Sequence, residues 1–227
     1  MSFLIKPLYR VYSKVIIKIR QNKQIFYSFF AFYPEDRKYK NYWDWTTLEL
    51  RKILKKNSGK ALSLLDMGTG PYAVLAIYGA IKLNYKQITA CDKIEELLLN
   101  AKKQRHSDKI CLIHSDLFKN IVGKFDLIVF NSPYIDDRTG NHLGIFNESL
   151  SQKRWSGGHD GLEIIRQFIK ETAEHLTENG IAALGFNCFY ITINQVKMEI
   201  EYYHLNIKKI NYNVFTKACV IEFERGN

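Results

Sequence analysis

The sequence predicts an α/β fold, with a doubly wound, mostly parallel sheet of seven strands, an antiparallel C-terminal strand and a basic helical N-terminal extension. Two observations support this prediction. From residue 61 onward, short apolar runs alternate with helical patterns. The net positive charge comes from the start of the chain, since residues 1–60 hold 14 Lys+Arg against 4 Asp+Glu, whereas residues 61–227 hold 19 of each and are neutral. We therefore predict an extension over residues 1–45 and a sheet domain over residues 46–227.

The extension is predicted to begin as a helix and to become strongly aromatic. Residues 3–20 repeat apolar side chains at helical spacing, with a basic stripe formed by Lys6, Arg10, Lys14 and Lys18. Residues 26–33 contain six aromatic side chains and are followed by Pro34. A second helical pattern covers residues 47–56 and leads into the sheet domain.

The sheet domain is predicted to alternate strands with helices. The strands are expected at 61–66, 87–91, 110–114, 125–130, 181–186, 206–213 and 218–224. Helices are expected at 71–83, 94–104, 161–178 and 191–203, the first with Pro71 in its opening turn and the third closed by Asn179 and Gly180. Residues 135–158 show little regular pattern and exceed the ~12–15 residues of a passive connection, which favours a binding loop.

A glycine-containing turn follows the first predicted strand. Asp66, Gly68 and Gly70 stand between that strand and the next helix, where glycines allow a ligand close to the backbone. The turn also fits a loose dinucleotide pattern, and Asp92 lies near the spacing of an acid that binds the ribose of NAD. However, Asp66 would face a pyrophosphate with like charge, whereas it could accept a hydrogen bond from the ammonium group of an amino-acid-bearing cofactor.

Two further acids end the next two predicted strands. Asp92 could accept from ribose hydroxyls, and Asp116 from an adenine amino group. Together with Asp66, they match S-adenosyl-L-methionine, which becomes S-adenosyl-L-homocysteine when its methyl group is transferred. The alternative is an ordinary strand-to-helix turn whose acids only cap the backbone.

The fourth predicted strand ends in Asn131-Ser132-Pro133-Tyr134. A planar amide or aryl-amine nitrogen is a poor nucleophile because its lone pair is delocalised. The side-chain oxygen of Asn131 and the carbonyl of Ser132 could accept both N–H hydrogens and turn the lone pair towards a methyl group. Pro133 would stiffen the turn, and Tyr134 would offer a ring to the flat acceptor. The gain would come from orientation. A plain strand-ending turn is the structural alternative.

These strings resemble the HemK/PrmC-type (release-factor glutamine) N-methyltransferases, within the Asn-Pro-Pro-Tyr class of Rossmann-fold, S-adenosyl-L-methionine-dependent methyltransferases. The similarity runs from about Trp43 to Phe186 and includes the segment 154–166 with its Gly-Gly-x-x-Gly pattern. The resemblance implies a Rossmann-like methyltransferase sheet. It also implies cofactor contacts from Thr47, Asp66, Gly68, Thr69, Gly70, Asp92, Lys93, Asp116, Leu117 and Asn131, and a catalytic acceptor site made of Asn131, Ser132, Pro133 and Tyr134.

The chain departs from the family pattern at three places. Ser132 replaces the first proline, which loosens the turn, and Tyr72 stands where a small residue is usual. Only 42 residues precede Trp43, as in a short branch of the family. Some members of that branch require a small zinc-binding partner, so the resemblance allows for a small activator subunit.

The role of the extension stays open between three interpretations. It could be a helix packed across the cofactor pocket with a solvated basic face, a nucleic-acid contact, or a helix lying on anionic lipid. No apolar run approaches the ~20 residues of a transmembrane helix, and the four cysteines form no Cys-x-x-Cys pair. We therefore expect a cytoplasmic protein without a transmembrane segment, and the spacing of the histidines predicts no metal site.

The predicted function is N-methylation of a planar nitrogen by S-adenosyl-L-methionine, with a protein glutamine side-chain amide as the first candidate acceptor. The alternatives are an exocyclic base amine in RNA or DNA and a small-molecule nitrogen, either of which the same four-residue site would serve. Outside enzymes, the chain could be a cofactor-binding scaffold that has lost transfer, and Ser132 is the residue that motivates this alternative.

Overall fold

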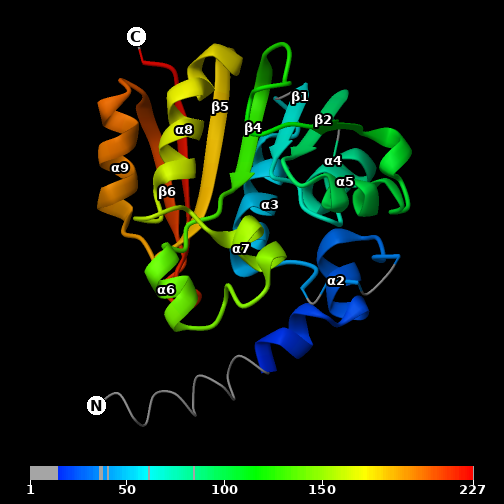
Figure 1. Cartoon of the computed structure of the whole chain (residues 1–227). Coiled ribbons are helices and arrows are strands. Elements are labelled where there is room, and N and C mark those ends of the chain that lie inside the picture. Colours follow the sequence, from blue (N-terminus) through cyan, green and yellow to red (C-terminus); the bar gives the residue numbers. More distant parts are fainter. Residues whose placement is uncertain (1–14, 36–37, 40, 61, 84, 227) are drawn as a thin grey trace.

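The computed structural model describes residues 15–35, 38–39, 41–60, 62–83 and 85–226. Within them, seven strands form one sheet in the order β3-β2-β1-β4-β5-β7-β6 (Figure 1). The strands are β1 (Ser63–Met67), β2 (Gln87–Asp92), β3 (Cys111–His114), β4 (Phe125–Asn131), β5 (Leu176–Asn187), β6 (Asn206–Tyr212) and β7 (Ala218–Glu224). The pairs among β1 to β5 are parallel, and β7 is antiparallel to both of its neighbours. The predicted fold class is therefore confirmed.

Helices cover both faces of this sheet. The α-helices are α2 (Lys23–Phe30), α3 (Trp45–Asn57), α4 (Val74–Lys82), α5 (Glu95–Lys102), α6 (Asp137–His142), α7 (Ser149–Trp155), α8 (Glu163–Thr172) and α9 (Ile193–Tyr202). Residues 15–20 are also helical. One buried cluster joins α2, α3 and α4 to the sheet, and a second cluster joins α8 and α9 to its other face. The rest of the helix predicted over residues 3–20 lies outside the described residues.

Two predicted helices are corrected by the structure. The helix predicted at 71–83 begins only at Val74, because the preceding residues form turns and Ala73 has a φ of 43°. The helix predicted at 161–178 ends at Thr172, and a short 3₁₀ turn leads into β5. Asn179 and Gly180 therefore lie in β5, where its register against β4 shifts, and do not close a helix.

The predicted irregular loop, 135–158, is also corrected. It contains the short helices α6 and α7, which are too brief to show a clear hydrophobic period in the sequence. The aromatic run is partly helical as well. It forms α2, whose start is capped by the side chain of Asn22, which accepts from the backbone N–H groups of Gln24 and Ile25.

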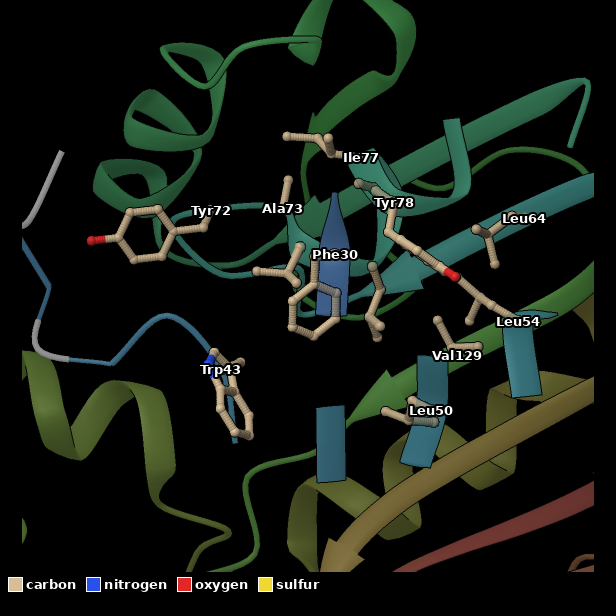
Figure 2. Close-up of a cluster of buried hydrophobic side chains, with 14 of the residues drawn as sticks. Phe30, Trp43, Leu50, Leu54, Leu64, Tyr72, Ala73, Ile77, Tyr78 and Val129 are labelled. Carbon is tan, nitrogen blue, oxygen red and sulfur yellow. The ribbon is translucent and has the colours of Figure 1, made fainter. Parts of the chain in front are cut away.

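The aromatic N-terminal region is packed into the same core as the sheet. Phe26, Phe30 and Phe32 are buried, and the Phe30 ring lies 6.1 Å from that of Tyr78 on α4. Figure 2 shows Phe30 and Trp43 among side chains of α3, α4 and the strands. The region therefore shares a hydrophobic core with the sheet, and the domain boundary at residue 45 stays a prediction.

Tyr72 explains one departure from the family pattern. Its side chain is 1% exposed, and its ring lies 6.1 Å from that of Tyr39 and 5.0 Å from that of Tyr42. Its hydroxyl oxygen accepts a hydrogen bond from the backbone N–H of Tyr39 at 3.2 Å. The large residue at this position thus holds the N-terminal region against the turn after β1.

Among the described residues, no helix is both long and apolar enough to cross a membrane.

Candidate active site

A cavity of about 530 Å³ opens at the carboxyl ends of β1 to β4. This edge is where parallel α/β sheets bind ligands. All thirteen residues predicted as site residues line it: Thr47, Asp66, Gly68, Thr69, Gly70, Asp92, Lys93, Asp116, Leu117, Asn131, Ser132, Pro133 and Tyr134. The structure therefore brings the predicted site residues together around one space, while their individual roles stay predictions.

Asp66 closes the turn after β1. Its carboxylate oxygen Oδ2 accepts from the Thr69 hydroxyl at 2.6 Å and from the backbone N–H of Ala76 at 3.2 Å. The second bond takes the place of a side-chain cap for α4, which has none of its own. Both bonds use Oδ2, so Oδ1 is the oxygen available to a ligand. Burial raises the pKa of Asp66 to about 7.

Gly68 and Gly70 shape the same turn. Gly68 has a φ of +62°, and a Cβ there would meet the Phe130 ring at 2.9 Å. Gly70 has a φ of +68°, and a Cβ there would meet nothing within 4 Å. Because Gly70 lines the cavity, the space beside it is the cradle that a ligand would fill.

Asp92 holds the turn from the neighbouring strand. Its carboxylate accepts from the backbone N–H of Gly70 at 3.0 Å and from that of Ile94 at 2.9 Å, one bond to each oxygen. Burial raises the pKa of Asp92, and the positive charge of Arg154 opposes that rise. Each carboxylate oxygen has a second lone pair, so Asp92 retains capacity for two ligand hydroxyls.

Three predicted residues lie at the rim of the cavity, on the side that Asp66 and Asp92 line. Lys93 and Asp116 are exposed and line the cavity, at the ends of β2 and β3. Leu117 is 5% exposed and has a positive φ of 49°, which turns the chain inward directly after Asp116. The rim therefore combines a carboxylate with an apolar side chain, which suits an adenine ring and its amino group.

Asn131 ends β4 on the other side of the cavity. Its side-chain nitrogen donates to both oxygens of Asp44, at 3.2 and 3.1 Å, and to the Thr47 hydroxyl oxygen at 3.3 Å. Its side-chain oxygen Oδ1 is buried and has no hydrogen-bond partner among the described residues. A buried acceptor without a partner is costly, so this oxygen is poised for a ligand donor.

The next residues fix the turn and supply a ring. The Ser132 hydroxyl and backbone N–H both donate to the Gly185 carbonyl, at 3.0 and 3.1 Å, so its side chain is tied to β5. The Tyr134 ring lies 5.7 Å from that of Tyr190. Burial raises the pKa of Tyr134 above its ordinary value, so the hydroxyl stays neutral at physiological pH.

The Gly-Gly-x-x-Gly segment supports this turn from outside. Ile135 donates to the Trp155 carbonyl at 3.2 Å and accepts from the Gly157 N–H at 2.9 Å. Gly161 has a φ of +78°, and a Cβ there would lie 2.8 Å from the Tyr134 carbonyl. The segment therefore lies directly against the backbone that follows Asn131.

Sequence patterns did not identify four further cavity residues as site residues: Arg20, Trp43, Asp44 and Arg154. The Arg154 guanidinium lies 5.5 Å from the Tyr39 ring and 5.2 Å from the Trp155 ring, and its charge acts on Asp92. Arg20 lies 5.8 Å from the Trp45 ring, on the acceptor side. Arg20 and Ile17 line the cavity, so the described part of the N-terminal helix, residues 15–20, borders it, and the three interpretations of the extension stay predictions.

Comparisons with known proteins point to one group of relatives. No family model matches the chain. It is 35% identical over 127 residues to the ribosomal protein uL3 glutamine methyltransferase of Francisella tularensis, covering 52% of this chain and 39% of that protein. It is 33% identical over 134 residues to the release factor glutamine methyltransferase of Streptococcus pneumoniae, covering 56% of this chain and 47% of that protein. The chain spans about half the length of these curated relatives.

Solved structures agree on the fold. A methyltransferase from Pyrococcus furiosus superimposes with a TM-score of 0.68 at 22% identity, covering 95% of this chain and 100% of that one. A ribosomal protein L11 methylase from Lactobacillus delbrueckii gives 0.61 at 21% identity, covering 82% and 81%. The resemblance predicted from the motifs is confirmed: several of the curated relatives are named as glutamine methyltransferases, and the chain has the Rossmann-like fold of the solved methyltransferases.

Proposed function

We propose that the protein is an S-adenosyl-L-methionine-dependent N-methyltransferase whose acceptor is a protein glutamine side-chain amide. The observation that carries the proposal is the buried Oδ1 of Asn131, which has no partner in the part of the chain that the structure describes, although the amide nitrogen of the same side chain has three acceptors near it. An oxygen presented in this way accepts an N–H of a planar group. The relatives named as glutamine methyltransferases support an amide as that group.

The other half of the cavity fits the cofactor. The open space beside Gly70 and the free oxygen of Asp66 suit an amino-acid end, and Asp92 suits the ribose. Asp116 and Leu117 would hold the adenine. When bound, S-adenosyl-L-methionine supplies an electrophilic methyl group and leaves as S-adenosyl-L-homocysteine.

The acceptor residues work by orientation. Asn131 Oδ1 and the Ser132 carbonyl would accept the two N–H hydrogens and turn the nitrogen lone pair towards the methyl group. The Tyr134 ring would lie against the flat amide and exclude water. Neither acceptor has to change protonation state. The nitrogen loses one N–H proton when it gains the methyl group, and this proton passes to solvent, so the neutral Tyr134 hydroxyl is not required to take it. The gain comes from holding the reacting atoms in line.

The test uses the full chain with methyl-labelled cofactor. Separate fractions of ribosomal proteins and release factors, RNA and small metabolites are offered as acceptors, and the labelled residue is identified by mass spectrometry. We expect label on a protein glutamine. Label only on a base amine or a metabolite would replace the glutamine proposal with one of its alternatives. Cofactor binding without any transfer would favour the scaffold.

The site is then tested with Asn131→Ala. We expect turnover to fall by about 100-fold or more, while the Kd for the cofactor changes by less than about twofold. The matched control is Asn141→Ala, at an exposed residue of α6 that does not line the cavity, and it should leave both unchanged. Retained turnover in the Asn131 variant would refute the acceptor site.

The remaining expectations about partners and location are proposals of the same kind. A cytoplasmic location would place the protein with ribosomal proteins and release factors, the substrates named for its relatives. An activator subunit and a nucleic-acid contact through the N-terminus stay predictions, and the acceptor test above is to be repeated at several salt concentrations, because phosphate contacts weaken steeply with salt.

A further inference from the structure

Asp44 is the residue that stands behind Asn131. It is the N-cap of α3 and lies 87 positions before Asn131 in the sequence. Its oxygens lie 3.2 and 3.1 Å from the side-chain nitrogen of Asn131. Asp44 is itself held in place, because its Oδ1 accepts from the Thr47 backbone N–H at 2.7 Å and from the Thr47 hydroxyl at 2.9 Å.

This contact can form with only one orientation of the Asn131 amide. An ionised carboxylate accepts hydrogen bonds and donates none. If the amide turned over, its oxygen would face the two oxygens of Asp44, and the hydrogen bonds between Asn131 and Asp44 would be lost. Asp44 therefore fixes the amide nitrogen towards α3 and the amide oxygen Oδ1 away from it.

The charge of Asp44 also acts on Oδ1. A carboxylate that accepts from an amide N–H polarises that amide and makes its oxygen a better acceptor, most strongly where water is excluded. Asn131 Oδ1 is buried, and Asn131 and Asp44 both line the cavity. The arrangement suits an oxygen that must hold one N–H of an acceptor amide during transfer.

We propose that Asp44 is a positioning residue for methyl transfer, which holds the Asn131 amide in the one orientation that presents its oxygen to the acceptor nitrogen. This inference rests on the proposed function of Asn131. Asp44 would then be necessary for the chemistry at Asn131, the last residue of β4, although Asp44 itself does not have to touch the substrate.

A structural role of Asp44 has to be separated from this one. As an N-cap, Asp44 stabilises α3, and Asn and Ser are about equally good caps. Asp44→Asn and Asp44→Ser therefore retain a cap. The first can present either end of an amide to Asn131, and the second is too short to reach it. Thr192→Ala is the matched control, because Thr192 caps α9 through the same kind of capping box.

The experiment measures two things separately, in the full chain: the clamp, by which we mean the contact of the Asp44 carboxylate with the Asn131 side-chain nitrogen, and the methyl transfer. NMR follows the side-chain NH₂ resonances of Asn131, and methyl-labelled cofactor gives kcat and the cofactor Kd. In the wild type we expect slow exchange of these hydrogens with water. In Asp44→Ser we expect fast exchange, a kcat lowered about tenfold or more, and a cofactor Kd within about twofold. Asp44→Asn should lie between them, and Thr192→Ala should lower Tm alone.

Three outcomes would overturn the proposal. Unchanged NH₂ exchange in Asp44→Ser would show that the carboxylate does not fix the amide. Altered exchange with unchanged kcat would show that the clamp has no part in transfer. A wild-type protein with protected hydrogens that transfers no methyl group to any acceptor would refute the proposed function, and with it the positioning role, while leaving the measured clamp in place.

Discussion

The two halves of the cavity are built in different ways. In the cofactor half, lined by Asp66, Gly70 and Asp92, two carboxylates already accept from backbone N–H groups: Asp66 from Ala76, and Asp92 from Gly70 and Ile94. In the acceptor half, which contains Asn131 and Tyr134, Asn131 Oδ1 has no partner within the described ranges, and the contacts that hold the residue come from the N-terminal end of α3. The carboxylates of the cofactor half are thus already held by backbone hydrogen bonds, whereas the acceptor half leaves one polar atom, Asn131 Oδ1, for the substrate to bind. Binding and chemistry should therefore separate when the two halves are mutated.

The largest effect is expected from the hydrophobic core that joins the N-terminal region to the sheet. Phe30 is fully buried, with its ring 4.9 Å from that of Phe26 and 6.1 Å from that of Tyr78. Phe30→Ala should lower the free energy of unfolding by about 3–5 kcal/mol, measured by denaturant titration. Tyr27→Ala is the control in the same helix, since Tyr27 is 46% exposed, and it should cost less than about 1 kcal/mol.

Equal stability losses in these two variants would contradict the shared core. They would instead support the N-terminal region as a separate extension that can be removed without destabilising the sheet. If the prediction holds, deleting residues 1–40 unfolds the protein, so such a deletion cannot be used to test substrate binding alone.

A smaller effect is expected in the cofactor half. Asp92→Ala removes the carboxylate that accepts from the turn and is proposed to accept from the ribose. The Kd for the cofactor, measured by calorimetry, should rise about tenfold or more, as for the loss of one charge-assisted hydrogen bond of roughly 1.5–3 kcal/mol. Turnover at saturating cofactor should fall far less than in Asn131→Ala.

Asp108→Ala is a control for Asp92, because Asp108 lies in a short 3₁₀ turn and does not line the cavity. It should leave the Kd unchanged. If the Kd is also unchanged in Asp92→Ala, or if the wild type prefers NAD in the same assay, S-adenosyl-L-methionine does not bind in this half of the cavity.

The two halves also differ in how far the sequence could predict them. In the cofactor half, the interacting residues are close along the chain or end neighbouring strands, as with Asp66 and Thr69. Regular alternation of strands and helices places such residues at one edge. The acceptor half was found only in part. Asn131 was identified, but its partner Asp44 lies outside the regular pattern, and a contact across 87 positions leaves no local trace.

The errors in the fold have similarly local causes. The helices α6 and α7 have 6 and 7 residues, too few turns to set a hydrophobic period. Asn179-Gly180 is a common helix stop, yet here β5 starts earlier because Leu176 already pairs with Phe125. Tertiary pairing overrode the turn preference of these two residues. No helix was predicted for the aromatic run, although Phe26 and Phe30, which are buried in α2, stand four positions apart.

The smallest expected effect concerns Asp66, and it depends on pH. Burial raises the pKa of Asp66 to about 7 in the cofactor-free protein, so its carboxyl is largely protonated below that pH. The ammonium group of the cofactor favours the charged form, and binding below pH 7 must therefore displace a proton. Affinity should rise about eightfold between pH 6 and pH 7.5 and level off above it. The cofactor-free protein behaves in the opposite sense, because a raised carboxyl pKa makes stability fall as the pH rises towards 7.

Asp66→Asn removes this titration and should give an affinity that is lower at pH 7.5 and no longer rises with pH. Calorimetry in two buffers of different ionisation enthalpy measures the proton released on binding, and taking the ratio of the wild-type and variant constants cancels the titration of the cofactor's own amino group. Parallel profiles would mean that Asp66 only accepts from Thr69 and Ala76 and never meets the ligand. If the affinity of the wild type rises with pH and that of the variant does not, the Asp66 carboxylate binds the cofactor, through the oxygen Oδ1 that its own turn does not use.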